Sequence, residues 1–190
     1  IFTWEVGDKA TTEQVIGAAG TDGSLSDRVA RLEEALTDAA SDPASDTRLG
    51  TVLRRLGELA AGINEAAADV QVLRYDADTS IASQVDTLNT SLQQVERLNG
   101  DIARLRAVGE DPSGLMDQRQ VVIDRIAEIV PVRVIQRDAG QIALLSTSGQ
   151  YLLDGPAAEI GFDPVTSIVA DMTLASGGLS GLTINGDPVT

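Results

Sequence analysis

Two side chains that carry much of enzyme chemistry are missing from this sequence of 190 residues, which contains no cysteine and no histidine. Without cysteine there is no disulfide, thiolate nucleophile or zinc-thiolate site. Without histidine the commonest general base and the commonest metal ligand are excluded as well. Any catalysis would therefore depend on carboxylates.

Aromatic and basic residues are also scarce. One tryptophan, two tyrosines and two phenylalanines leave little for a stacking platform or an aromatic-lined ligand pocket. The 14 basic residues face 29 acidic ones, and the net charge of -15 repels phosphate backbones and anionic lipid. We therefore expect neither nucleic acid nor a membrane as a partner. The tight basic pairs, Arg54 with Arg55 and Arg104 with Arg106, are expected on solvated helix faces.

Long apolar runs are absent too. No stretch approaches the roughly 20 apolar residues that span a bilayer, and the start lacks the profile of a cleaved secretory signal. The sequence predicts a soluble chain. Because it begins at Ile1 without methionine and stops at Thr190 just after a turn signal, we expect a segment of a longer protein.

Three helices are expected, over about 24–40, 42–108 and 111–130. In the first, apolar residues recur at spacings of three and four from Leu25 to Leu36, which places them on one stripe. Asp42 and Pro43 are expected to start the second, since aspartate accepts bonds from free amides and proline suits the first turn. Asp111 and Pro112 repeat this pattern before the third.

The second helix is predicted to be unusually long. No proline occurs between Ala44 and Asp111, and some 65 helical residues would extend roughly 100 Å. Its apolar positions form a heptad-like seam, with a phase shift near Ile81 that resembles a stutter. The seam comprises Leu49, Leu53, Leu56, Leu59, Ile63, Ala66, Val70, Leu73, Ala77, Ile81, Val85, Leu88, Leu92, Val95, Asn99 and Ile102.

Glycines are the weak points of this long helix. Gly57, Gly62 and Gly100 each cost about 1 kcal/mol relative to alanine. The pair Asn99 and Gly100 is also a hairpin signal, but its flanks keep helical periodicity, so we expect a continuous helix.

Beyond Pro131 the pattern changes to short strands and turns. The expected strands are Val132 to Ile135 and Gln141 to Leu145 as a hairpin, then Tyr151 to Leu153, Ile168 to Leu174 and Leu182 to Ile184. The prediction is an α+β chain: an elongated antiparallel helical bundle over residues 1–130, followed by a small, incomplete β-rich domain over 131–190.

No motif in the sequence carries chemistry. Asp76 and Asp78 are spaced like calcium-loop ligands, but no glycine follows at the bend and the twelfth position is Thr87. Other acids fit the solvated faces of amphipathic helices: Glu33, Glu34, Glu58 and Glu65. We therefore predict no catalytic, cofactor-binding or metal-binding residues, no cofactor and no enzymatic activity. A carboxylate enzyme would have to use Asp76, Asp78, Asp117 or Asp124.

Asn99 is the one polar residue in the seam. A buried amide between helices commonly fixes their register, which is the first interpretation. In the second, Asn99 bonds to water or to a neighbouring turn of the chain beside Gly100. Neither interpretation implies a ligand.

Three stretches, in this order, resemble the flagellar hook-associated protein 1 family. They are Asp42-Pro43-Ala44-Ser45 with Arg48, Val52 and Leu53; Val85 to Asn89 with Leu98 to Ile102; and Leu115-Met116-Asp117-Gln118-Arg119 with Ile123-Asp124, Ile126 to Val130, Gly149 and Tyr151 to Leu153. The third is the most specific. The chain departs from the family pattern at Met116, Gln120, Ser113 and Gly114.

The resemblance implies a structural subunit of the bacterial flagellum that joins hook to filament by axial self-assembly, with the family's terminal helices absent. It implies secretion to the extracellular flagellum and, as partners, neighbouring axial subunits (the hook protein, other hook-associated proteins and itself) and an export chaperone. In this family setting Asp117 would help its helix to start, and Arg119 would bond a carboxylate or a backbone carbonyl.

Without its polymerising ends the chain should be a rod-shaped monomer. The alternative is an extracytoplasmic helical binding module or adhesin stalk, which predicts a ligand-lined or self-dimerising seam.

Overall fold

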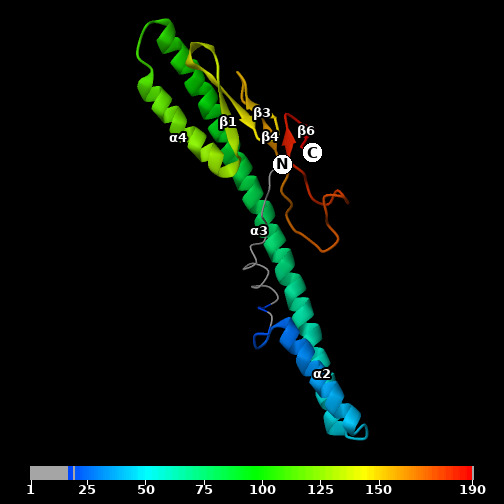
Figure 1. The fold of residues 1–190 in the computed structure, drawn as a ribbon. Helices are drawn as coiled ribbons and strands as arrows, with labels where there is room; N and C mark the ends of the chain where they lie inside the picture. The colour runs from blue at the N-terminus through cyan, green and yellow to red at the C-terminus, as the bar shows by residue number, and fades with distance from the viewer. Residues whose placement is uncertain (1–16, 19, 190) are drawn as a thin grey trace. The chain divides into compact units, whose positions relative to one another are not determined.

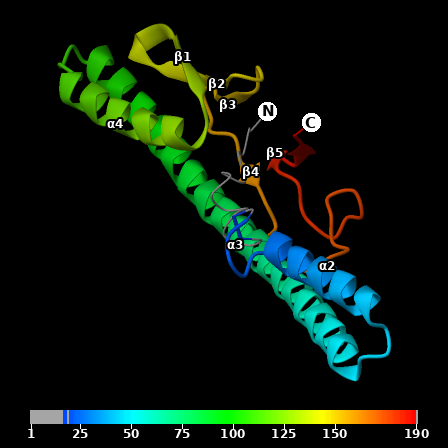
Figure 2. The same ribbon diagram turned by 60° about the horizontal axis from the view of Figure 1, so that its bottom comes forward.

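The computed structural model describes residues 17, 18 and 20–189. In this part of the chain, helices come first and short antiparallel strands follow, as Figures 1 and 2 show. The expected α+β class with one very long helix is confirmed.

Helix α2, Leu25–Ser41, begins where the sequence predicts. The Ser24 side chain caps it by accepting a hydrogen bond from the Asp27 amide at 3.2 Å. The Asp27 carboxylate in turn accepts from the Gly23 amide at 2.9 Å, and this bond lowers the pKa of Asp27. The helix ends at Asp42, whose amide donates to the Ala39 carbonyl.

Helix α3, Asp46–Ala107, runs for 62 residues and is unbroken at Asn99 and Gly100. Its expected start at Asp42 and Pro43 is wrong by four residues. Asp42 is instead the C-terminal cap residue of α2, and its carbonyl accepts a hydrogen bond from the Ser45 amide in a turn. Ser45 is placed to cap α3 instead, because its hydroxyl accepts from the Arg48 amide at 3.5 Å.

Helix α4, Ser113–Ile129, lies beside the last turns of α3 (Figures 1 and 2). Its start is fixed by Asp111, whose carboxylate accepts from the Ser113 amide at 3.0 Å and from the Ser113 hydroxyl at 2.8 Å. These bonds lower the pKa of Asp111. Asp111 therefore does what was expected of Asp117, which is exposed in the second turn of the helix.

The first sheet has the antiparallel order β1-β2-β3, from Val132–Gln136, Ile142–Ser146 and Tyr151–Leu153. Val134 pairs with Leu144 in the expected hairpin. The connection is a single 3-10 turn, Asp138–Gly140, in which Ala139 and Gly140 have positive φ of 54° and 77°. Both the hairpin and β3 are confirmed.

The second sheet joins β4, β5 and β6, which are Ile160–Gly161, Thr183–Ile184 and Asp187–Pro188. Asn185 and Gly186 connect the last two with φ of 52° and 87°, as a two-residue hairpin requires. Strand β4 was not predicted from the sequence, because it is only two residues long.

The strand expected over Ile168 to Leu174 is wrong. This stretch is irregular, and its backbone is used in turns such as the bond from the Gly178 amide to the Thr173 carbonyl at 3.1 Å. Ile168 is buried, but Leu174 is 66% exposed. Alternating apolar residues form a strand only where a neighbouring strand pairs with them, and none does so here within the described residues.

Contacts group the described residues into two compact units. One holds residues 17, 18, 20–76 and Ile168–Ala170; the other holds Ala77–Ser167 and 171–189. We call them the first and second unit. The domain boundary expected at residue 130 coincides with the change from helix to strand and stays a prediction for the intact protein.

The two halves of the α3 seam differ in burial. In the second unit, Leu88, Leu92 and Val95 are at most 1% exposed and pack in an aliphatic core with α4 and the strands. In the first unit, the seam residues Leu53, Leu56 and Ile63 are 69%, 51% and 52% exposed. The seam is therefore most deeply buried over its second half, although Ala66 in the first unit is also buried.

Candidate functional site

A row of polar side chains follows one face of α3 in the second unit. Asp78, Asn89, Glu96 and Asn99 are separated by 11, 7 and 3 residues, close to whole turns of an α-helix. Each bonds to the backbone of the β region; the Asp78 carboxylate accepts from the Val165 amide at 2.8 Å and Glu96 from the Ala157 amide at 3.0 Å. These bonds attach the strands and loops of the second unit to α3.

The two asparagines of this row each bond both main-chain groups of one strand residue. Asn89 donates to the Ile160 carbonyl at 2.8 Å and accepts from the Ile160 amide at 2.9 Å. Asn99 does the same with Ile142, at 2.8 and 3.3 Å. We call these arrangements the asparagine clasps. Each side-chain amide takes the place of a residue on a neighbouring strand, with one donor and one acceptor.

The strand geometry leaves these main-chain groups free for the clasps. Just before β4, Glu159 bonds to Asn185 on one side through both its amide and its carbonyl, so the groups of the next residue, Ile160, face the other side. On β2, the pairing with β3 begins at Leu144, which leaves Ile142 open to Asn99. In the structure Asn99 bonds to Ile142 of β2 and accepts from Arg119 of α4, so it joins its helix both to a strand and to the next helix.

Arg119 extends the second clasp to α4. This side chain is only 5% exposed, and its Nη1 donates to Asn99 Oδ1 at 2.7 Å and to the Gly140 carbonyl at 2.8 Å. Arg119 therefore joins α3, α4 and the turn between β1 and β2. Of its two expected partners, the backbone carbonyl is present.

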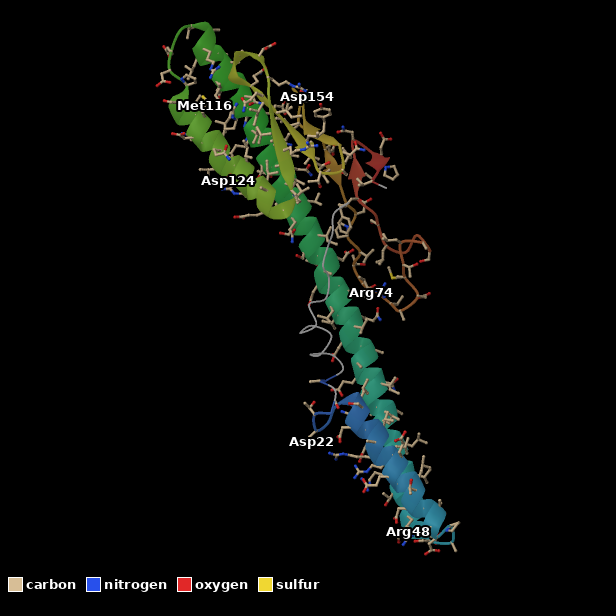
Figure 3. The ribbon with its side chains drawn as sticks, in the orientation of Figure 1. Asp22, Arg48, Arg74, Met116, Asp124 and Asp154 are labelled. Atoms are coloured by element: carbon tan, nitrogen blue, oxygen red, sulfur yellow. The ribbon has the colours of Figure 1, made fainter. Side chains whose placement is uncertain are left out.

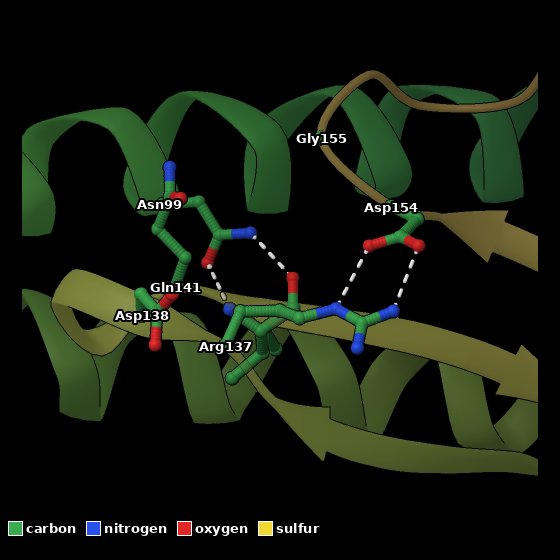
Figure 4. A pocket seen from close by; sticks show the side chains of 7 residues that line it. Asn99, Arg137, Asp138, Gln141, Asp154 and Gly155 are labelled. Carbon is green, nitrogen blue, oxygen red and sulfur yellow. Dashed lines mark hydrogen bonds and ion pairs between the residues drawn. The ribbon is translucent and has the colours of Figure 1, made fainter.

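An open pocket of about 400 Å³ lies beside this cluster. Its lining comprises Asn99, Arg137, Asp138, Gln141, Ile142, Asp154 and Gly155. Figure 4 shows the Arg137 guanidinium bonded to both oxygens of Asp154, at 2.9 and 2.8 Å. The Asp154 bond raises the pKa of Arg137, which also lies 5.9 Å from the Tyr151 ring centre. The cation in this pocket is thus already neutralised by a side chain of the pocket.

The acids considered for catalysis are not brought together. Asp76 and Asp117 are exposed, Asp124 accepts from Gln120 on α4, and Asp78 is buried against the Val165 amide. Figure 3 shows Asp124 on α4, away from the end of β3 where Asp154 lies. Across the described residues, no group of three acidic side chains could hold a metal ion.

The basic pairs form local ion pairs on α3. Glu58 bonds Arg54 at 3.1 Å and Arg55 at 2.8 Å, and these bonds lower the pKa of Glu58. Arg104 pairs with Asp101, whereas the Arg106 guanidinium lies against Gly140. Within the described range, no helix is both long and apolar enough to cross a bilayer.

The Asn89 clasp is the element of this cluster that was not predicted from the sequence. Asn89 lies one position beyond the buried Leu88 of the seam, and Asn99 follows it by ten residues. The only sign of it in the sequence was that Asn89, like Asn99, lies close to the buried side of the long helix.

A family model and several known proteins match this chain. The family model described as the flagellar hook-associated protein FlgK helical domain matches residues 10–181. Flagellar hook-associated protein 1 of Salmonella typhimurium is 29% identical over 168 residues, which is 83% of this chain and 29% of that protein. The protein of the same name from Bacillus subtilis is 31% identical over 109 residues, covering 55% and 21% of the two chains.

A solved structure shares the fold. The flagellar hook junction protein FlgK from Burkholderia pseudomallei aligns with a TM-score of 0.67 and 20% identity over 80% of this chain and 28% of that one. The present chain thus spans less than a third of the length of these proteins. Because the family model covers most of its residues, the chain belongs to the FlgK family of flagellar hook-associated proteins, of which it carries the helical domain.

Proposed function

We propose that this chain is part of the subunit that joins the flagellar hook to the filament through axial self-assembly. The observation that carries the proposal is the family match over residues 10–181. The similar Burkholderia protein is described as a flagellar hook junction protein, which supports the same role.

The role we propose is structural rather than catalytic, with no catalytic, cofactor-binding or metal-binding residues. The chemistry of the described polar residues supports it. Asn89, Asn99 and Arg119 bond mainly to main-chain groups, which hold strands to helices. Arg137 with Asp154, and Glu58 with its two arginines, form ion pairs.

Neighbouring axial subunits are the partners that this role requires: the hook protein, other hook-associated proteins and further copies of the same subunit. We also propose an export chaperone and secretion to the extracellular flagellum. The excess of acidic residues, 29 against 14, supports export, since a high net charge keeps a subunit dispersed before assembly.

Genetic replacement tests the proposal in the intact protein. In a flagellated bacterium that carries this gene, deletion should leave hooks without attached filaments by electron microscopy, and the full-length gene should restore both filaments and swimming. A double variant, Asn89→Ala with Asn99→Ala, should restore fewer filaments and less swimming than the control Asn64→Ala, in which the changed residue is exposed. Filaments that remain firmly joined in the deletion strain would disprove the junction role.

An extracytoplasmic binding module or adhesin stalk is the second candidate. The exposed seam residues of the first unit, Leu53, Leu56 and Ile63, favour it, because such a row could pair with another helix. Light scattering after size exclusion separates the two proposals: the junction fragment should run as a monomer of 19.8 kDa at every concentration, and the stalk should dimerise.

A further inference from the structure

Arg119 is a buried cation whose hydrogen-bond acceptors are both neutral. It is 5% exposed, and its two hydrogen bonds go to an amide oxygen and a main-chain carbonyl. Among the described residues, no carboxylate lies within ion-pair distance of it. Buried charges in proteins are normally paired with an opposite charge, because removing a lone charge from water costs several kcal/mol.

A second guanidinium lies at the same turn. Arg106, in the last turn of α3, is so close to Gly140 that a Cβ on this glycine would be 2.5 Å from Arg106 Cζ. Its Nη2 is 3.7 Å from the Met116 sulfur, and again no ion pair joins it to a described carboxylate. Burial and the charge of Arg106 together lower the pKa of Arg119. Two like charges thus meet at Gly140.

Both side chains keep hydrogen-bond donors that are not sealed from solvent. Arg119 uses Nη1 for its two bonds, which leaves Nε and Nη2. In the described part of the chain, every side-chain nitrogen or oxygen that is sealed from solvent has a hydrogen-bond partner. The remaining nitrogens of Arg119 are therefore accessible, and Arg106 is itself exposed.

We propose that Arg106 and Arg119 bind one oxyanion beside the Gly140 turn. A planar carboxylate or a tetrahedral sulfate or phosphate matches the fork of donors on a guanidinium. The anion would separate the two positive charges and give Arg119 the counter-charge that the described residues do not supply. This is a local exception on a chain of net charge -15, whose surface otherwise repels anions. The proposal does not rest on the function proposed above.

The oxyanion could come from two sources: a free inorganic ion, or an acidic side chain of an adjacent subunit. Both present the same oxygens to the two guanidinium groups. Sulfate and acetate are therefore suitable probes, with chloride at equal ionic strength as the reference for screening.

The test is an NMR titration of the ¹⁵N-labelled chain, followed through the Gly140 amide and the Arg119 Nε–H signals. Arg106→Gln is the test variant, because Arg106 is exposed and its loss should leave the fold intact. Arg104→Gln is the matched control, since Arg104 is also exposed, lies two residues away and pairs with Asp101.

We expect a saturable shift with sulfate or acetate in the unchanged chain and in Arg104→Gln, and at least tenfold weaker binding in Arg106→Gln. Tighter binding of sulfate assigns the site to a free inorganic anion, and equal or tighter binding of acetate assigns it to a carboxylate side chain. No saturable shift, or the same affinity in both variants, would overturn the proposal.

Discussion

At the scale of single residues, Asn99 connects α3 to both β2 and α4 through hydrogen bonds. Its oxygen accepts from both Arg119 and the Ile142 amide, and its nitrogen donates to the Ile142 carbonyl. Alanine here would leave two buried main-chain groups and one guanidinium without this partner. Because each buried unsatisfied group costs about 1–3 kcal/mol, Asn99 should be among the polar residues most important for stability.

We therefore predict that Asn99→Ala lowers the free energy of unfolding by about 2–4 kcal/mol, measured by urea denaturation. Asn64→Ala is the control, since Asn64 is exposed on the same helix and both changes bring the same gain in helix propensity. Equal stability of the two variants would show that the clasp contributes nothing.

A second prediction concerns Asp111, whose folded-state pKa is lowered by its bonds to Ser113. A lowered pKa adds stability at pH values above the ordinary pKa of 3.8. This stability is lost as the pH falls through the folded-state pKa. Asp111→Ala should therefore be less stable than the unchanged chain at neutral pH, and the difference should shrink on acidification below that value. Denaturation curves at several pH values test this, and a difference that grows in acid would contradict it.

At the scale of elements, the sequence predicts the helices and the first hairpin well because each has local signals. Pro131 precedes the hairpin and the turn at Gly140 divides its two strands, and the run without proline after Ala44 defines α3. The start of α3 was misplaced because Asp42 can serve either as the end of one helix or as the start of the next. The strand expected at Ile168 was wrong because alternation says nothing about a pairing partner.

The polar cluster was only partly predictable for the same reason. Burying an arginine already implies a bond to some carbonyl, but the choice of Gly140, 21 residues later, depends on how the hairpin packs on α4. The Asn89 clasp depends on β4, which is too short to leave a periodic signal.

Gly100 offers a prediction about α3 itself. It lies inside the helix, and a Cβ there would meet nothing within 4 Å. Gly100→Ala should therefore raise the free energy of unfolding by about 0.5–1 kcal/mol, through the lower backbone entropy of the unfolded chain, as read from thermal denaturation.

Gly62 is the matched comparison for this substitution. A Cβ at Gly62 would lie 2.5 Å from Arg28 Nη1, and that nitrogen bonds the Glu58 carbonyl at 3.0 Å. Gly62→Ala should thus raise the free energy of unfolding by less than Gly100→Ala does. The opposite order would mean that Gly100 is held in a backbone conformation that favours glycine.

At the scale of the whole molecule, like charges repel one another across a chain of net charge -15. Local pairs such as Glu58 with Arg55 relieve only part of this repulsion. Because salt screens repulsion between exposed charges, the folded state should become more stable as salt is added.

We predict that the thermal midpoint rises between about 0.01 and 0.15 M sodium chloride, over which the Debye length falls from about 30 to 8 Å. Chloride is used because it separates general screening from specific oxyanion binding. A midpoint that falls with salt would mean that ion pairs outweigh the net repulsion.

The asparagine clasps have one more consequence, for solubility. Strands at the edge of a sheet expose main-chain groups to which other polypeptides can add, and this is a common route to aggregation. Asn89 and Asn99 occupy the amide and carbonyl of Ile160 and Ile142. Ile160 lies on the edge strand β4, and Ile142 lies on the end of β2 that has no partner in β3. The side chains of α3 thus occupy these main-chain groups and keep them from pairing with a strand of another chain.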